Sequence, residues 1–219
     1  MNKNLRPKLK VCGLTQLNQI HELISLKTDF LGFIFYEKSP RYVLNQLNPE
    51  DISKISHPGK TGVFVNETID KITDIAEQAG LNMIQLHGDE NEDFMIGLKQ
   101  NLKPEIKIIK AVRIGSNDQE TKEKIEKTIS SHVSLVDYFL FDTDSKAFGG
   151  TGKQFDWTLL NEFEIPLPYF LSGGISEENI EGIGLLNKKP FAIDINSKFE
   201  LKPGIKNLEK IKKFISKPF

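Results

Sequence analysis

The sequence predicts an α/β protein built as a single (β/α)8 TIM barrel with parallel strands. Short apolar runs rich in strand-forming residues alternate along the chain with longer segments whose apolar residues recur every three or four positions. Eight such repeats fit within 219 residues, a length at which one α/β barrel domain is common. Parallel strands need a crossover between them, which the helical segments supply, so we expect a parallel sheet covered by helices.

The apolar runs favour a closed barrel over an open sheet. A doubly wound open sheet usually has about five or six strands and often a glycine-rich turn after the first one. Here the first strand is followed by Cys12-Gly13-Leu14-Thr15 rather than by G-x-G-x-x-G, and we see no linker within the single domain expected over residues 1–219. The strands are expected near residues 9–12, 30–35, 61–65, 83–86, 106–112, 138–142, 169–172 and 191–194.

Helical periodicity appears between the strands. Apolar residues recur within 17–24 after the first strand and within 69–79 after the third, where Gly80 is a typical C-terminal stop. The last segment, 208–215, has the same period and carries lysines that suit the negative end of a helix. The helix after the second strand is the least clearly marked. The glycine-rich, polar residues 143–154 are typical of a mobile loop.

Composition restricts the class of protein. Basic and acidic residues nearly cancel, 29 against 30, so there is no global field to attract nucleic acid. The single cysteine cannot pair within the chain, and the N-terminal residues show no signal-peptide pattern, so we expect a cytoplasmic protein. The longest apolar run, 138–141, is far too short for a membrane span. We expect a monomer or a homodimer, and the net charge does not decide between them.

Polar residues at the carboxyl ends of the strands form the candidate site, because the active sites of barrels lie at that end. Some of them have plain structural alternatives: a lone cysteine is often a small buried apolar residue, and a strand-end carboxylate often binds a loop amide. The candidates are Cys12, Arg41, His87, Asp142, Gly173, Gly174, Asp194, Asn196 and Ser197.

Two kinds of chemistry suit these residue types. A thiol and a carboxyl group, Cys12 and Asp142, can serve as an acid and base pair. Glycine turns permit close approach of the backbone to an anion, and the loops after strands seven and eight of a barrel often bind phosphate together. Gly173 and Gly174 lie in the first of these loops. The planar guanidinium of Arg41 suits a carboxylate if it points inward.

No metal site is expected. His87 lies in Gln85-Leu86-His87-Gly88-Asp89-Glu90, but the four histidines have no H-x-x-H spacing and there is no cysteine cluster to complete a zinc site. Asp194 could also serve only to orient the loop after strand eight. Trp157 is expected in the packing rather than in substrate stacking.

The chain resembles the phosphoribosylanthranilate isomerase family nearly end to end, with one motif in each βα unit. Each motif is weak alone, but the order and spacing are specific. The motifs lie at 10–15, 31–35, 39–43, 62–66, 85–90, 141–143, 149–152, 155–157, 172–175 and 203–204.

The resemblance implies an Amadori rearrangement of N-(5-phosphoribosyl)anthranilate in tryptophan biosynthesis, without a cofactor. By motif, Asp142 would be the general acid that opens the furanose ring, and Cys12 the general base that removes a proton from the second carbon of the sugar. Arg41 would hold the anthranilate carboxylate. Amides around Gly174, with Asn196 and Ser197, would hold the phosphate.

The sequence departs from the family pattern after strand eight. Asn196 replaces the first of two serines, and Lys198 stands where the family has glycine. We expect Lys198 to change the loop backbone or to add a cation near the phosphate. Ser172, where alanine is common, is a tolerable change.

Two rival functions stay open at this point. Another phosphate-binding barrel, such as indole-glycerol-phosphate synthase or a pentose-phosphate epimerase, would use different residues, and Lys110 is the one obvious synthase candidate. A catalytically inactive barrel that binds a phosphorylated ligand is the alternative from another class. The presence of both Cys12 and Asp142 favours the isomerase.

Overall fold

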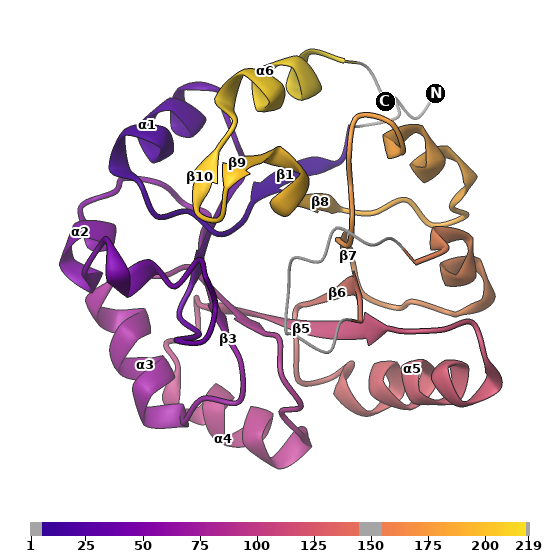
Figure 1. Ribbon diagram of the computed structural model, residues 1–219. Helices are drawn as coiled ribbons and strands as arrows, with labels where there is room; N and C mark the ends of the chain where they lie inside the picture. Colours follow the sequence, from indigo (N-terminus) through magenta and orange to yellow (C-terminus); the bar gives the residue numbers. More distant parts are fainter. Residues whose placement is uncertain (1–5, 145–154, 218–219) are drawn as a thin grey trace.

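The computed structural model shows a closed barrel of eight parallel strands in the order β1 to β8 (Figure 1). It describes residues 6–144 and 155–217. The predicted fold class is therefore confirmed, and each expected strand is present to within two residues at either end. The strands are β1 Lys8–Val11, β2 Phe30–Ile34, β3 Lys60–Phe64, β4 Met83–Leu86, β5 Lys107–Ile114, β6 Tyr138–Thr143, β7 Tyr169–Leu171 and β8 Ala192–Ile195.

Helices surround the barrel and connect its strands (Figure 1). Most begin at a short polar side chain that accepts a backbone N–H of the first turn, as Thr68, Asn91, Asp118 and Asn207 do. The third ends before Gly80, whose φ of 59° is the left-handed conformation expected at that stop. The α-helices are α1 Leu17–Ser25, α2 Pro49–Ser53, α3 Ile69–Gln78, α4 Glu92–Asn101, α5 Gln119–His132 and α6 Leu208–Ser216.

The regions after β2, β6 and β7 differ from a regular helix. After β2 there is a 3-10 turn, η1 Val43–Asn45, and then the short α2. After β6 and β7 the described residues form 3-10 helices only, η2 Trp157–Glu162 and η3 Ile180–Leu185. Two glycines within η3, at positions 182 and 184, disfavour an α-helix there. Most of the predicted loop 143–154 lies outside the described residues.

A small hairpin was not predicted. A 3-10 turn, η4 Ser197–Phe199, leads from β8 into β9 Glu200–Lys202, which pairs antiparallel with β10 Ile205–Lys206. The hairpin is tied to the residues after β1, because the Thr15 hydroxyl donates to the Gly204 carbonyl at 2.8 Å. Gln19 on α1 exchanges two hydrogen bonds with the backbone of Lys206. This places the hairpin beside the carboxyl end of β1.

Apolar residues form two separate groups. The larger group fills the space between the strands and the outer helices. The smaller group fills the inside of the barrel with one or two side chains from most strands, which is the packed interior expected of this fold. Its buried members are Phe30, Met83, Ile109, Ala111, Leu140, Phe170 and Ala192.

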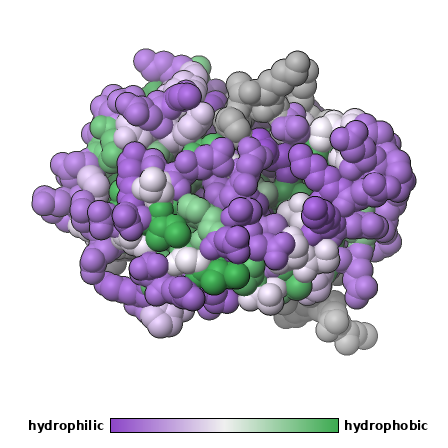
Figure 2. All heavy atoms as spheres, turned by 90° about the horizontal axis from the view of Figure 1, so that it is seen from below, coloured by the Kyte–Doolittle hydropathy of each residue, from purple (hydrophilic) through white to green (hydrophobic). Residues whose placement is uncertain are grey.

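The surface is mostly polar on the side that Figure 2 shows. Figure 2 shows one side of the molecule covered largely by hydrophilic side chains, with apolar ones in small groups. No helix in the described part of the chain is long and apolar enough to cross a membrane.

Candidate active site

A cleft opens at the carboxyl ends of the strands and contains every predicted site residue. It encloses about 820 Å³, including the part open to solvent. Among the described residues, every βα unit except that of β5 contributes side chains at or just after the end of its strand, which is why residues far apart in sequence meet here. The predicted residues that line it are Cys12, Arg41, His87, Asp142, Gly173, Gly174, Asp194, Asn196 and Ser197.

Cys12 lies directly after β1 with its side chain against β2. The residue is 5% exposed, yet it lines the cleft. Gly32 makes room for it, because a Cβ built at Gly32 would lie 2.8 Å from the Cys12 sulfur. Burial raises the pKa of the Cys12 thiol, and the ammonium groups of Lys10 and Lys206 offset only part of that rise.

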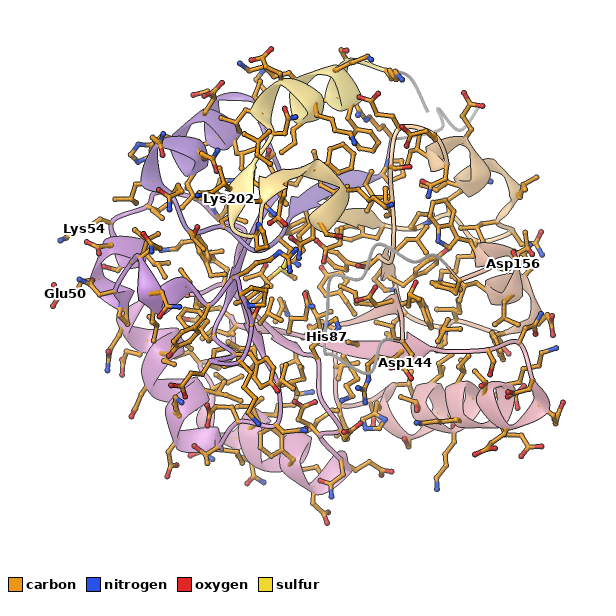
Figure 3. The ribbon with its side chains drawn as sticks, viewed as in Figure 1. Glu50, Lys54, His87, Asp144, Asp156 and Lys202 are labelled. Atoms are coloured by element: carbon orange, nitrogen blue, oxygen red, sulfur yellow. The ribbon has the colours of Figure 1, made fainter. Side chains whose placement is uncertain are left out.

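Asp142 and His87 meet in the same cleft. The Nε2 atom of His87 lies 3.2 Å from an Asp142 carboxylate oxygen, and Gln85 bonds the other ring nitrogen at 2.8 Å. The backbone N–H of Thr143 donates to the second Asp142 oxygen. Figure 3 shows His87 near the centre of the ring of strands, whereas Glu50 and Lys54 lie at the outer edge of the molecule. His87 is thus placed to orient the Asp142 carboxyl group, a partnership the sequence did not indicate.

Two adjacent glycines follow β7. Gly173 and Gly174 have φ of 85° and 67°, a conformation that favours glycine. A Cβ at Gly173 would lie 2.4 Å from the Thr143 hydroxyl and 3.1 Å from an Asp142 oxygen. Asn179 stabilises the turn, because its side chain donates a hydrogen bond to the Gly174 carbonyl at 2.9 Å. The glycines therefore bring backbone close to Asp142, next to the turn that carries Asn196 and Ser197.

Arg41 reaches the cleft, but a carboxylate of the protein already binds one side of it. Its Nε and Nη2 atoms donate to Glu200 on β9 at 2.7 to 3.0 Å. Glu200 also accepts from Lys206 at 2.7 Å, and Lys206 donates to Asn196 at 2.8 Å. Among the described residues, no hydrogen bond of the Arg41 Nη1 atom is found. Its binding of a substrate carboxylate stays a prediction.

Comparisons with known proteins agree with this geometry. Residues 9–217 match the family described as N-(5'phosphoribosyl)anthranilate (PRA) isomerase. The chain belongs to this family. The N-(5'-phosphoribosyl)anthranilate isomerase of Parabacteroides distasonis is 41% identical over 94% of this chain and 91% of its own length. That of Caldanaerobacter subterraneus is 38% identical, over 96% and 97%.

Solved structures of family members share the fold. Phosphoribosyl anthranilate isomerase from Thermotoga maritima is 34% identical and superposes with a TM-score of 0.78, over 96% of this chain and 97% of the other. A phosphoribosyl anthranilate isomerase in complex with reduced 1-(o-carboxyphenylamino)-1-deoxyribulose 5-phosphate is 32% identical, with a TM-score of 0.73 and the same coverage.

In this member of the family, Asp194 has a partner that the sequence did not reveal. Its Oδ2 atom accepts from Lys10 at 2.7 Å, and both side chains are buried. The other oxygen, Oδ1, is buried without a hydrogen-bond partner in the part of the chain that the structure describes. Asp194 lines the cleft, so this unpartnered oxygen belongs to a residue of the candidate site.

Lys110 does not support the synthase alternative. Ile109 and Ala111 point into the barrel, so Lys110 between them points outward. Its ammonium group donates to Glu90 at 2.8 Å and to the Gly88 carbonyl at 2.9 Å. It thereby fixes the loop after β4, which carries His87. Trp157 is buried, as expected.

No metal centre is apparent among residues 6–144 and 155–217. Groups of three or more histidine, cysteine, aspartate or glutamate side chains placed to hold an ion do not occur there. The residues that sequence reasoning missed are Lys10, Gly32, Gln85, Glu200 and Lys206. All but Gln85, which bonds His87 two residues further along, act through a partner on another strand or loop, and a single sequence gives no signal for such a contact.

Proposed function

We propose that this chain is a phosphoribosylanthranilate isomerase that converts N-(5'-phosphoribosyl)anthranilate to 1-(2-carboxyphenylamino)-1-deoxyribulose 5-phosphate in tryptophan biosynthesis. The observation that carries the proposal is the presence of a thiol and a carboxyl group, Cys12 and Asp142, in one cleft of a chain that belongs to this family. A family member has been solved with the reduced form of this product, which supports the same ligand class here.

The reaction needs one acid and one base. Asp142 donates its proton to the ring oxygen of the ribose, the C1–O bond breaks, and the furanose opens to a Schiff base between C1 and the anthranilate nitrogen. The Cys12 thiolate then takes the proton from C2, the C–H electron pair forms a C1–C2 double bond, and the π pair of the C1–N double bond moves onto the nitrogen. The resulting enolamine becomes the ketone when C1 gains a proton and the C2 hydroxyl loses one. Protons move, and no net electrons are exchanged.

Two anionic ends of the substrate are bound by different loops. Backbone amides at Gly173 and Gly174, with Asn196 and Ser197, bind the phosphate at the turn after β8. The Nη1 side of Arg41 binds the anthranilate carboxylate. Fixing both ends orients the sugar between acid and base, and such positioning supplies a large part of the rate in a reaction without a cofactor.

The remaining site residues act close to the acid. His87 contacts the Asp142 carboxyl group and directs its proton towards the substrate, and we place it among the residues that touch the ligand. Asp194 accepts a hydrogen bond from a substrate hydroxyl through its unpartnered Oδ1 atom. We further infer one domain over residues 1–219, acting without a cofactor as a monomer or a homodimer in the cytoplasm, where a single unpaired cysteine is stable.

The test is turnover by the wild-type protein. Phosphoribosylanthranilate is generated in situ, and its conversion is followed as loss of substrate fluorescence. We expect rapid loss that depends on enzyme concentration and needs no added metal or cofactor. A protein that binds the reduced product analogue but does not convert the substrate would instead be a non-catalytic barrel for a phosphorylated ligand, and the proposal would be wrong.

A further inference from the structure

A buried ion pair lies directly beneath the Cys12 thiol. Lys10 lies on β1 two residues before Cys12, which directly follows that strand, so both side chains point into the barrel. On β8, Asp194 is the register partner of Lys10, and their charged atoms are 2.7 Å apart. The side chains are 0% and 5% exposed. The acid and base steps described above do not use Lys10, so this buried cation needs another explanation.

The charges of the pair act on the thiol with opposite signs. The positive charge of Lys10 favours the Cys12 thiolate. Asp194 acts by charge and disfavours it. The other cation that faces Cys12 is Lys206 on β10, which is tied to Glu200 and Asn196. Across the cleft, the charge of Asp142 raises the pKa of Asp194 and that of His87 lowers it.

We propose that Lys10 and Asp194 form a positioning pair that sets how readily Cys12 gives up its proton, with Lys10 stabilising the thiolate and Asp194 limiting that effect. The inference rests on the proposed role of Cys12 as general base. Lys10 thereby gains a role in the reaction, and Asp194 gains a second role besides the proposed contact with the ligand.

The pair explains why the cation persists at this depth. Burial alone favours a neutral lysine, but Asp194 and Cys12 outweigh burial and raise the pKa of Lys10, so it stays charged. A general base also needs a pKa that is neither too low nor too high. A thiolate that is stabilised too strongly binds a proton weakly and is a poor base, whereas a thiol without a nearby cation does not ionise. A cation with its own counter-ion gives Cys12 an intermediate environment.

The experiment measures ionisation of the thiol without reference to turnover. Cys12 is the only cysteine, so the rate of alkylation by iodoacetamide as a function of pH reports on this group alone. Replacing Lys10 by Met removes the cation, and we expect alkylation near pH 7 to become about tenfold slower or more, because a nearby opposite charge typically changes the thiolate fraction by at least that factor. For Asp194→Asn we expect faster alkylation than in the wild type.

Two further variants complete the design. Removing one partner of a buried ion pair is strongly destabilising, so the neutral double variant Lys10→Met/Asp194→Asn provides a second folded comparison. It is expected to react more slowly than the wild type, because Lys10 acts on the thiol more strongly than Asp194 does. The matched control is Lys8→Met, which removes an exposed cation from the same strand and should leave the alkylation profile unchanged.

The outcomes separate this inference from the proposed function. The inference is supported if alkylation of Cys12 is slower in Lys10→Met, faster in Asp194→Asn and slower in the double variant than in the wild type. Unchanged rates, or shifts of both single variants in the same direction, would overturn it, since a purely structural role predicts no change of sign. If the shifts appear but Cys12→Ala still turns over substrate, the pair tunes the thiol and the base assignment in the proposed function is wrong.

Discussion

At the scale of single residues, the site depends on how closely its parts approach Gly13. This residue has φ of 75°, and a Cβ there would lie 2.7 Å from Arg41 Cδ and 2.9 Å from Asn196 Oδ1. Gly13 therefore lets the loops after β2 and β8 meet directly beside Cys12. Gly13 is thus a point at which the two loops proposed to bind the carboxylate and the phosphate come together, in addition to the Arg41–Glu200 ion pair.

Replacing Gly13 by Ala should disturb both loops. We expect the free energy of unfolding to fall by about 1–2 kcal/mol from the backbone conformation alone, and kcat/KM to fall because Arg41 and Asn196 are displaced. Urea unfolding and steady-state kinetics measure the two effects. Gly184→Ala is the control, because nothing lies within 4 Å of a Cβ at that position. Equal effects of the two substitutions would contradict the account.

Lys198 adds a cation beside the loop proposed to bind the phosphate. It is exposed and lines the cleft beside Ser197. Lys198→Gly should raise KM at low ionic strength, and the difference from the wild type should shrink as salt screens the charge. Lys198→Met removes the charge but keeps a non-glycine backbone, so it should raise KM as Lys198→Gly does if the charge is responsible. A KM that is unchanged by Lys198→Gly at every ionic strength would show that Lys198 does not assist phosphate binding.

At the scale of elements, the β9–β10 hairpin delivers Glu200 and Lys206 to the cleft. Burial opposes the charge on Glu200, but Arg41 and Lys206 outweigh burial and hold the pKa of this carboxyl group below its ordinary value. A lowered pKa means that the folded protein favours the ionised group. Its stabilising effect is present above the ordinary pKa of about 4.3 and is lost as the pH falls through the lower value in the folded state.

Glu200→Gln should therefore destabilise the protein in a pH-dependent way. We expect a loss of about 3–5 kcal/mol at pH 7, because two buried cations lose their partner, and a rise in KM as Arg41 loses its position. Urea unfolding at several pH values should show the difference from the wild type shrinking as the pH falls below about 4. Glu209→Gln on α6, where the side chain is 85% exposed, is the control. A difference that stays constant down to low pH would contradict the prediction.

The sequence predicted the barrel elements better than the elements around it. The strands are short apolar runs whose burial determines them, so β4 was placed without error at 83–86. The β9–β10 hairpin escaped notice because its residues are mostly charged or exposed and are held by contacts with Thr15 and Gln19. The segment after β7 forms a 3-10 helix, because its two glycines and short length disfavour an α-helix.

At the scale of the whole molecule, the two ends of the barrel do different work. Apolar residues fill the barrel interior away from the carboxyl ends of the strands. Among them, the rings of Phe30 and Phe170 have their centroids 5.2 Å apart. Polar and charged groups, beginning with Lys10 and Asp194, occupy the interior near the carboxyl ends. This division is typical of the fold, in which one end supplies stability and the other the chemistry.

Phe170→Ala should separate these two functions. The side chain is fully buried, so its loss should lower the free energy of unfolding by about 3–5 kcal/mol, while kcat of the folded protein should change little. Denaturant unfolding and kinetics under native conditions measure the two quantities. Ile96→Ala, at a position that is 43% exposed, should have little effect on either. A large fall in kcat without loss of stability would contradict this division.

The candidate site was predicted as a set but not as a network. All nine predicted residues line one cleft, because the fold class fixes where the loops meet. Their supporting partners were not predicted: Lys10 and Asp194 are 184 positions apart, and Arg41 and Glu200 are 159 apart. Which charged residues pair across the barrel depends on strand register, and periodicity in one sequence does not reveal register.

The measurement that tests the central claim most directly compares kcat of the wild type with kcat of Cys12→Ala and Asp142→Asn, alongside binding of the reduced product analogue by each. We predict that each substitution lowers kcat by about 10²- to 10⁴-fold while binding is retained, because each removes one proton-transfer group and leaves the anion-binding loops in place. Turnover by the wild type that is indifferent to both substitutions would contradict the assignment of Cys12 and Asp142 as base and acid.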